Sequence, residues 1–442
     1  MLHSITTQAI GPCASMTVDL APRLNLFAGD NGVGKSFLLD LAWWLLTRTW
    51  SGEPIRPTKA PRTPAGGARG TIRYPISTVR FAIDKPTRGR SEYDVVFDWT
   101  KQDWKRVAGR PPSPGLVLYA RVDGGFCVWD PARNDWKDAP PSNVSDDLRP
   151  PAFLFDTHSI WSGLKGPDGA VLCKGLLQDW VEWQTTRDPA FDQLTRVLEH
   201  LSSGDGDIGL RPGAPTRVSL GDVRDVPTLA MPYGDVPIVH ASAAMRRVAA
   251  LAYLLVWAFR EHTRAREFLG QKPERRIIFL IDEVEAHLHP RWQRVILPAM
   301  LDVTRELAPK ASVQLLVTTH SPFVPLSVET RVDDRQDALW ELDLAGREVT
   351  LTRKPWELHG DAAGWSTSST FDLPSTRSVD GEKALRAADE LLLRADSDPA
   401  GVKAAEVAAV DRSLHDALPE LDPLFARWGA FKDRLARRKA KR

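Results

Sequence analysis

The sequence predicts an α/β fold with a parallel core sheet, an antiparallel β lobe and a helical C-terminal segment. Three observations support this prediction. A glycine-rich loop, "GDNGVGKS" at residues 29–36, stands between a strand-like stretch and a helix-like stretch. Two short apolar runs, 276–281 and 313–319, are bounded like central parallel strands. The last 60 residues are helical in pattern and end in the basic tail "RLARRKAKR".

The composition is that of a soluble globular protein, since 43% of the 442 residues are hydrophobic and 26% are charged. The opening residues lack a charged leader followed by an apolar stretch. The longest apolar run, 250–259, is too short to cross a bilayer. The three cysteines lie far apart, which argues against a disulfide framework. We therefore expect a cytoplasmic protein without membrane partners.

In chain order, residues 1–46 read as strand, strand, tight loop and helix. Residues 47–160 read as a β-rich lobe that begins with a loop rich in Pro, Gly and Arg and contains hairpins at "DGG" and "ARND". Residues 161–237 are expected to form a helical insertion. These segments belong to a predicted head, 1–330. A hairpin and further helices make up the predicted C-terminal segment, 331–442.

The glycine-rich loop has the composition of a nucleotide phosphate site. Its glycines let the backbone curl so that successive amides point at phosphate oxygens, while Lys35 reaches the terminal phosphates and Ser36 offers its hydroxyl to Mg²⁺. The strand before the loop and the helix after it distinguish it from an ordinary Gly-rich turn. The predicted ATP-binding residues in this region are Gly29, Asp30, Asn31, Gly32, Val33, Gly34, Lys35, Ser36 and Phe37.

Acidic residues and histidines are concentrated in one short stretch, "FLIDEVEAHLHP" at 279–290. Beside a phosphate loop, an apolar strand that ends in Asp then Glu places Asp282 near the Mg²⁺ and Glu283 where it polarises an attacking water. An alternative makes His287 and His289 ligands of zinc or iron, although no third histidine or cysteine lies nearby in sequence. A plain surface loop would also accommodate both histidines.

A further histidine follows the second apolar run. His320 comes directly after "VQLLVTT", at the carboxyl end of a strand that we expect beside the acidic one. From that position it can hydrogen-bond the γ-phosphate of ATP. A histidine of this kind, taken alone, is more often structural, so this prediction depends on the phosphate loop and the acidic pair.

The segments "GDNGVGKS", "FLIDEVEAHLHP" and "LLVTTHSP" together resemble the Walker A, Walker B with D-loop, and switch-histidine segments of the ABC-type ATPases of the RecF, SMC and OLD group. The resemblance covers residues 20–46 and about 238–330. It implies a homodimer that binds each ATP between the phosphate loop of one subunit and a signature segment of the other. By residue, Lys35 and Ser36 match Walker A, Asp282 the magnesium carboxylate, Glu283 the catalytic base, 285–290 the D-loop and His320 the switch.

The signature segment departs from the pattern of the family. In its place stands "HASAAMRR" at 240–247, ahead of a helix that we expect to be buried. Ser242 fits the family serine that caps this helix and contacts the ATP of the other subunit. Ala243 and Ala244 stand where glycines usually let a phosphate approach the backbone, so we expect slow turnover. A helix start without any nucleotide role is the alternative.

About 200 residues separate Ser36 from the signature, and they contain no sustained heptads. Neither a compact transporter subunit nor a long coiled coil is therefore expected. The segments "FLFDTHSIWSGL", "ASAAMRRVAALAYLLVW" and "LRAADELLLRA" resemble ATPases of bacterial anti-phage systems, such as the PtuA subunit of Septu and retron-associated ATPases. This resemblance implies a nucleotide-gated sensor or regulator that acts with a separate effector nuclease encoded nearby. The alternatives are a RecF-like DNA repair or recombination ATPase and an ATP-binding scaffold with little turnover.

A basic stretch is the candidate contact for DNA or another nucleic acid. Residues 48–90 contain ten Lys or Arg against two acids, although the formal net charge of the chain is only +1. Clustered cations beside a flexible glycine loop can follow a phosphate backbone. A solvated basic face without a partner is the alternative. The candidate DNA-binding residues are Arg62, Arg69, Arg73 and Arg80.

Overall fold

The computed structural model describes residues 1–57, 76–85, 89–105, 113–134, 152–202, 209–398 and 401–440. The chain divides into two compact units, 1–365 and 366–442. The division expected at residue 330 is corrected by this finding. The hairpin that follows residue 330 pairs into the central sheet of the first unit, so it cannot belong to a separate C-terminal segment.

The first unit is built on an eight-stranded sheet whose middle strands run parallel. Its strands are apolar and almost completely buried in the middle of the sheet, as is typical of strands covered on both faces. In spatial order they are β19 (Glu348–Lys354), β18 (Asp337–Ala345), β3 (Leu24–Gly29), β17 (Ser312–Thr319), β16 (Arg276–Ile281), β7 (Leu116–Ala120), β8 (Phe126–Trp129) and β9 (Phe153–Phe155).

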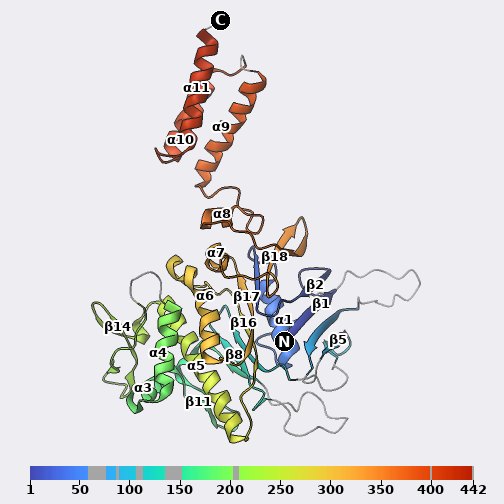
Figure 1. The fold of residues 1–442 in the computed structure, drawn as a ribbon, viewed down its shortest axis with the longest axis vertical. Helices are drawn as coiled ribbons and strands as arrows, with labels where there is room; N and C mark the ends of the chain where they lie inside the picture. Colours follow the sequence, from blue (N-terminus) through green and yellow to red (C-terminus); the bar gives the residue numbers. More distant parts are fainter. Residues whose placement is uncertain are drawn as a thin grey trace, which may run out of the picture. The chain divides into compact units, whose positions relative to one another are not determined.

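A second, antiparallel sheet forms the predicted β lobe. In spatial order it contains β2 (Ser15–Asp19), β1 (Leu2–Gln8), β4 (Thr78–Asp84), β5 (Arg90–Asp98) and β6 (Asp103–Trp104). Helix α1 (Lys35–Thr47) lies between the two sheets, and Trp43 packs in one core with Ile5, Phe81 and Tyr119 (Figure 1). The "DGG" hairpin is present between β7 and β8, but it extends the central sheet rather than the lobe. Asp135, the last residue of "ARND", and the residues that follow it up to 151 lie outside the described residues, so the hairpin expected there is not tested.

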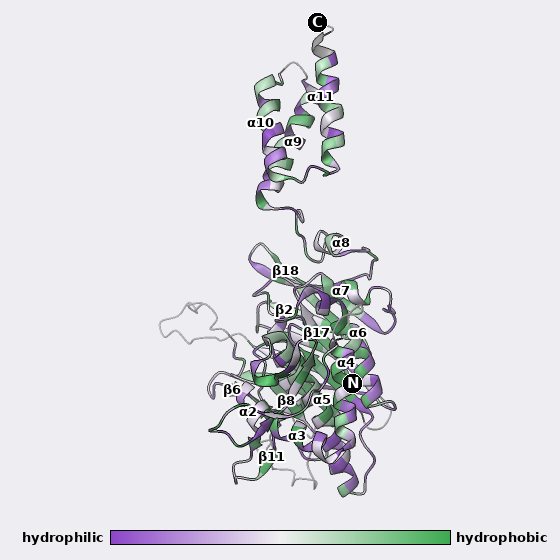
Figure 2. Cartoon of the chain, turned by 90° about the vertical axis from the view of Figure 1, so that its left-hand side faces the viewer, coloured by the Kyte–Doolittle hydropathy of each residue, from purple (hydrophilic) through white to green (hydrophobic). Residues whose placement is uncertain are grey.

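Helices cover the opposite face of the central sheet (Figure 1). They include α2 (Thr157–Ser162), α3 (Leu176–Thr186), α4 (Pro189–Ser202), α5 (Ala243–Phe268), α6 (Pro290–Leu307) and α7 (Phe323–Val328). Hydrophobic residues gather on the central strands, and hydrophilic residues predominate on the outer helices (Figure 2). None of the described helices combines the length and hydropathy that a bilayer crossing requires.

The predicted helical insertion is only partly helical. Short hairpins flank or follow α3 and α4, because turn residues interrupt the chain there. They pair β10 (Leu164–Lys165) with β11 (Val171–Cys173), β12 (Thr216–Arg217) with β13 (Asp225–Val226), and β14 (Thr228–Met231) with β15 (Gly234–Pro237). A short 3₁₀ helix, η2 (Ile238–His240), then leads into α5.

The second unit is helical, as its sequence predicts. After α8 (Ala362–Ser366), which spans the division between the units, it contains α9 (Val379–Ser397), α10 (Ala404–Ala417) and α11 (Leu424–Ala440). The three helices enclose a small core in which Ala388, Leu414 and Trp428 are almost completely buried. The Trp428 indole donates to Asp411 at 2.7 Å, so α10 and α11 are also joined by a hydrogen bond.

Candidate nucleotide site

The phosphate loop lies between β3, which ends at Gly29, and α1. A Cβ on Gly29, at φ +140°, would lie 2.0 Å from the carbonyl oxygen of Leu342. A Cβ on Gly34, at φ +98°, would lie 2.5 Å from Cγ of Pro12. The shape of this loop therefore depends on glycine at both positions.

Lys35 is buried at the start of α1, and its side chain folds back over the loop. Its Nζ donates to the carbonyl oxygens of Gly29 and Asp30, each at 2.7 Å. Burial lowers the pKa of Lys35, and the negative charges of Glu283 and Glu285 oppose that shift. The lysine and the acidic stretch therefore share one electrostatic environment, although about 250 residues separate them in sequence.

Three neighbouring parallel strands deliver the predicted motifs to one edge of the sheet. Strand β17 lies between β3 and β16, with Val317 opposite Ile281. The phosphate loop follows β3, Asp282 follows β16, and His320 follows β17. Parallel strands place their carboxyl ends at the same edge, which explains how the motifs meet. The expected neighbourhood of the histidine strand and the acidic strand is confirmed.

Thr318 ties the two catalytic candidates together, and sequence reasoning missed it. Its hydroxyl donates to Oδ1 of Asp282 at 2.7 Å and accepts from the backbone N–H of Glu283 at 2.7 Å. Asp282 is 1% exposed, and Glu283 adopts a left-handed conformation at φ +47°. A non-glycine residue in that region is strained, so the bond from its N–H helps to hold it there. The sequence signal that could have indicated this role is the pair of threonines, Thr318 and Thr319, directly before His320.

His320 lies beside both glutamates of the acidic stretch. Its Nδ1 is 3.2 Å from Oε1 of Glu285 and 3.8 Å from Oε1 of Glu283. Its backbone N–H also donates to Oε1 of Glu285 at 2.7 Å. Glu285 is 3% exposed, and this burial raises the pKa of its carboxyl group. The histidine itself is accessible, with 41% of its side chain exposed.

The other two histidines of this stretch have separate positions. His287 is exposed and adopts φ +63°. His289 precedes α6 and caps it, since Nδ1 accepts from the backbone N–H of Arg291 at 3.2 Å. Within the described part of the chain, no group of three or more His, Cys, Asp or Glu is arranged to hold a metal ion. The position of His289 is therefore that of a helix cap.

The predicted signature segment starts α5. The Ser242 hydroxyl caps this helix by accepting from the backbone N–H of Met245 at 3.3 Å. Ser242 and Ala243 are exposed and Ala244 is half-buried, so the beginning of the helix is accessible to a second molecule. Most residues of α5 from Val248 to Phe259 are buried, which confirms the expected buried helix over that stretch.

The comparisons with known proteins concern the same region. Residues 233–327 match the family described as "AAA domain, putative AbiEii toxin, Type IV TA system". The chain is similar to the "Retron Ec83 probable ATPase" of Escherichia coli, with 39% identity over 96 residues, and to the Septu protein PtuA of Bacillus mycoides (strain KBAB4), with 36% identity over 100 residues. Each match spans 22% of this chain but only 15% and 13% of the respective relatives.

Among solved structures, the chain is similar to the SMC head domain from Thermotoga maritima, with 13% identity, a TM-score of 0.40, and coverage of 80% of this chain and 99% of that chain. It is also similar to the recombination mediator protein RecF in the RecFOR pathway, with 13% identity, a TM-score of 0.36, and coverage of 79% and 98%. The matched family segment contains the start of α5, the acidic pair and His320, and the fold places the latter two beside the phosphate loop. Over residues 233–327 the chain therefore resembles ATPases of this AAA family.

Arg247 connects α5, the helix that begins within the predicted signature segment, to the central sheet. Its guanidinium donates to the carbonyl oxygens of Val122 at 3.1 Å and Arg121 at 3.3 Å, in the turn after β7. Burial lowers the pKa of Arg247, and the charges of Asp282 and Glu283 oppose that shift. Helix α5, which Ser242 caps, is therefore joined to the end of β7. Strand β7 lies next to β16, and the acidic pair follows β16.

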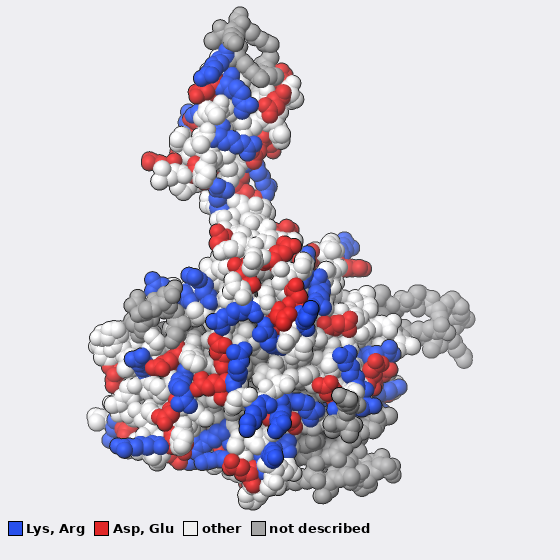
Figure 3. Space-filling model, viewed as in Figure 1, with Lys and Arg blue, Asp and Glu red and all other residues white. Residues whose placement is uncertain are grey.

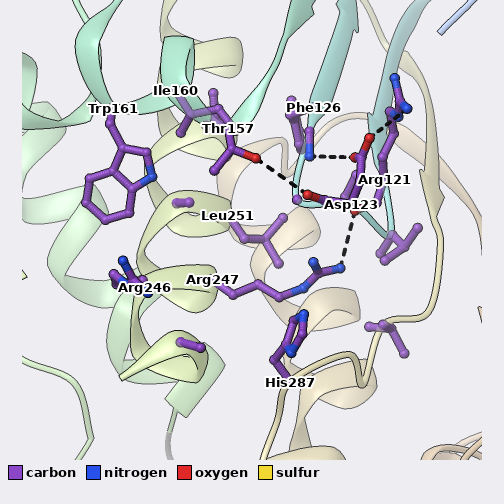
Figure 4. A pocket seen from close by; sticks show the side chains of 18 residues that line it. Arg121, Asp123, Phe126, Thr157, Ile160, Trp161, Arg246, Arg247, Leu251 and His287 are labelled. Atoms are coloured by element: carbon purple, nitrogen blue, oxygen red, sulfur yellow. Dashed lines mark hydrogen bonds and ion pairs between the residues drawn. The ribbon is translucent and has the colours of Figure 1, made fainter. Parts of the chain in front are cut away.

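A cavity of about 270 Å³ adjoins the edge of the central sheet that holds the candidate site. Its lining comes from the turn after β7, from α2, from the first turns of α5 and from the end of β16. Figure 4 shows Trp161 and Leu251 beside the space, with Arg247 reaching across to the turn. Because Ile281 and Val284 line the cavity and flank the acidic pair, this space shares a wall with the nucleotide site.

The candidate DNA-binding residues are only partly described. Arg62, Arg69 and Arg73 lie outside the described residues. Arg80, on β4, forms an exposed cross-strand ion pair with Asp94 on β5, with Nε 2.7 Å from Oδ1. Positive and negative side chains alternate over the face shown in Figure 3. Part of the charge of Arg80 is therefore already balanced, which weakens it as a contact for DNA.

Proposed function

We propose that this chain binds ATP with Mg²⁺ and hydrolyses it. The observation that carries this proposal is the meeting of the phosphate loop, Asp282, Glu283 and His320 at the carboxyl ends of three adjacent strands. Lys35 and the amides of the loop would bind the phosphates. The other three side chains would surround the bond that breaks.

The donor set fits a Mg²⁺–nucleotide complex. Ser36 supplies a hydroxyl at the start of α1, and Asp282 supplies a carboxylate at the end of β16; Mg²⁺ prefers oxygen donors of these kinds. Thr318 holds Oδ1 of Asp282 and so fixes the direction of Oδ2. When bound, the ion offsets negative charge on the phosphates.

The proposed chemistry is an in-line attack of water on the γ-phosphorus. Glu283 accepts a proton from the water as its oxygen bonds to phosphorus, and the bond from phosphorus to the bridging oxygen breaks to give ADP and phosphate. His320 hydrogen-bonds the γ-phosphate. The strained, threonine-held backbone of Glu283 favours this role because it fixes the direction of the carboxylate.

Substitution of the base and of the phosphate lysine tests the chemistry. Glu283→Gln should keep ATP binding and stop turnover, whereas Lys35→Ala should weaken both. Glu306→Gln is a matched control, since Glu306 lies on α6 and pairs with Arg196 at the surface. ATP binding is measured with a fluorescent analogue and turnover by phosphate release. Equal turnover in wild type and Glu283→Gln would refute the assignment.

We extend the proposal to a homodimer in which Ser242 of each subunit contacts the ATP of the other. The exposed, capped start of α5 supports this arrangement. Ala243 and Ala244 add methyl groups at that contact, so the dimer should form and turn over slowly. Light scattering of Glu283→Gln with and without ATP tests it. A monomer under both conditions would contradict it.

The proposed biological role is that of a nucleotide-gated regulator in anti-phage defence, together with a separate effector nuclease encoded nearby. The similarity to a retron ATPase and to a Septu protein supports this role. In a bacterium that carries the whole locus, Lys35→Ala should restore phage plating. A RecF-like repair factor would instead change survival after DNA damage, and an ATP-binding scaffold would keep its function with Glu283→Gln.

Nucleic-acid binding by the basic stretch is a separate proposal. Residues 48–90 carry a surplus of eight positive charges, and if half of them neutralise phosphates, log affinity should fall with log salt at a slope of about −4. Replacing Arg62, Arg69 and Arg73 with Ser should weaken DNA binding and flatten that slope. Arg80→Ser is the control because Arg80 already pairs with Asp94. Unchanged affinity in the triple variant would eliminate this site.

A further inference from the structure

Glu285 makes two contacts with a single residue, His320. Its Oε1 accepts from the backbone N–H of His320 at 2.7 Å and lies 3.2 Å from Nδ1 of the same histidine. We propose that Glu285 is a positioning residue that fixes the tautomer and the ring orientation of His320. This inference rests on the proposed ATPase function and deepens it.

The geometry specifies which ring nitrogen carries the proton. An oxygen that already accepts from the backbone N–H can take a second hydrogen bond from Nδ1–H, and an ionised carboxylate only accepts. Nδ1 therefore carries the proton, and Nε2 is the ring atom left for the nucleotide. Because the backbone and the ring are held by one oxygen, the imidazole has little freedom to turn away from the catalytic edge.

The same contact keeps the catalytic base free. Nδ1 of His320 lies 3.8 Å from Oε1 of Glu283, which is too long for a hydrogen bond, and 3.2 Å from Oε1 of Glu285. Glu285 thus takes the proton donor that would otherwise pair with Glu283. The Glu283 carboxylate remains available to the attacking water.

A purely structural role would be poorly served by a carboxylate here. Glu285 is 3% exposed, and no donor in the described residues lies within 3.5 Å of its buried Oε2 in hydrogen-bonding geometry. The Thr319 hydroxyl gives this carboxyl group only a minor stabilisation that opposes the rise of its pKa. Burying a carboxyl group in this way is costly, and a neutral side chain would fill the position at lower cost. A carboxylate at this position is explained if its other oxygen, Oε1, orients His320.

Kinetic comparison of four variants tests the proposal. Glu285→Gln keeps an acceptor oxygen and should retain kcat within about 3-fold of wild type, whereas Glu285→Ala should lower kcat at least 10-fold with KM nearly unchanged. The double variant Glu285→Ala/His320→Ala should be no slower than His320→Ala alone, because Glu285 acts through the histidine. Wild-type kcat in Glu285→Ala, or losses that multiply in the double variant, would overturn the proposal.

A second measurement does not depend on hydrolysis. Nitrogen-15 spectra of histidine-labelled protein, with His320→Ala to assign the signal among the 10 histidines, report which nitrogen of His320 is protonated. We expect Nδ1–H in wild type and Glu285→Gln, and its loss in Glu285→Ala. An Nε2–H tautomer in the wild type would overturn the proposal. A protein without turnover but with the expected tautomer would refute the ATPase function alone. If Glu285→Ala does not fold, Glu285→Leu replaces it in both measurements.

Discussion

Replacing Thr318 with valine should damage both stability and turnover. Valine has the same shape, so the change removes the hydroxyl without opening a cavity. Thr318 is fully buried, and its hydroxyl makes the two 2.7 Å bonds to Asp282 Oδ1 and to the N–H of Glu283. In the valine variant, Oδ1 of Asp282 and the N–H of Glu283 would both lose their hydrogen bond to residue 318.

The magnitude follows from those two orphaned groups. Leaving a buried donor or acceptor unsatisfied costs about 1–3 kcal/mol, so the loss of two bonds should lower the free energy of unfolding by about 2–6 kcal/mol. A non-glycine residue in the left-handed region costs about 1–2 kcal/mol, and Glu283 at φ +47° would lose a bond that holds it there. Its carboxylate should then leave the catalytic direction, and turnover should fall at least 10-fold.

The assay compares Thr318→Val with a matched control, Thr304→Val. Thr304 is also buried, but its hydroxyl bonds the helix carbonyl oxygens of Met300 and Leu301, so its loss should cost about 1 kcal/mol or less. Denaturant midpoints by circular dichroism and phosphate release by absorbance give the two readouts. Identical midpoints and turnover in the two variants would refute the reasoning about Thr318.

Three further outcomes are expected. Gly29→Ala should abolish nucleotide binding because its Cβ would lie 2.0 Å from a backbone oxygen. Gly32→Ala should weaken binding far less, because its Cβ would have no neighbouring atom within 4 Å. Titration with a fluorescent ATP analogue compares the two variants, and equal losses of binding would contradict the steric argument. Burial raises the pKa of Asp179 to about 6 from an ordinary value of 3.8, so the folded state binds this proton more tightly and loses about 3 kcal/mol of stability as pH rises from about 4 to about 6. Asp179→Asn should remove that part of the pH dependence in denaturant titrations, and an unchanged slope would show that Asp179 does not cause it. Ala244→Gly should speed ATP-dependent association and turnover in light-scattering and phosphate-release measurements, and no change in either would mean that the cross-subunit contact is misplaced.

The elements that carry the strongest local signals were predictable. The strand, glycine-rich loop and helix around Lys35 are encoded within a few residues, because glycine is needed where the backbone takes positive φ and a phosphate must approach it. The two apolar strands, the capped start of α5 and the C-terminal helices were likewise found at or near their predicted positions. Hydrophobic periodicity and capping act over one or two turns, so a single sequence contains them.

Pairing between distant segments could not be predicted in the same way. Strands β18 and β19 look like an independent hairpin in sequence, yet β18 pairs in parallel with β3 and thereby moves the unit boundary from 330 to 365. Likewise, β7 and β8 were expected in the antiparallel lobe, but both are buried at every position and extend the central sheet. A strand's own residues specify its period and not its neighbour, because the partner is chosen by packing of the whole core.

By itself, the sequence determined which groups make up the candidate site: a glycine-rich loop between a strand and a helix, an acidic pair after an apolar strand and a histidine after another. Only the tertiary structure decided how those groups are held. Thr318 binds Asp282 and Glu283 together, and Glu285 rather than Glu283 takes the nearer contact with His320. These contacts join the ends of β16 and β17, which lie about 35 residues apart in the chain and side by side in the sheet. Differences of a few tenths of an ångström between donor and acceptor decide whether a hydrogen bond forms, and these distances are set only once the parallel strands are in register.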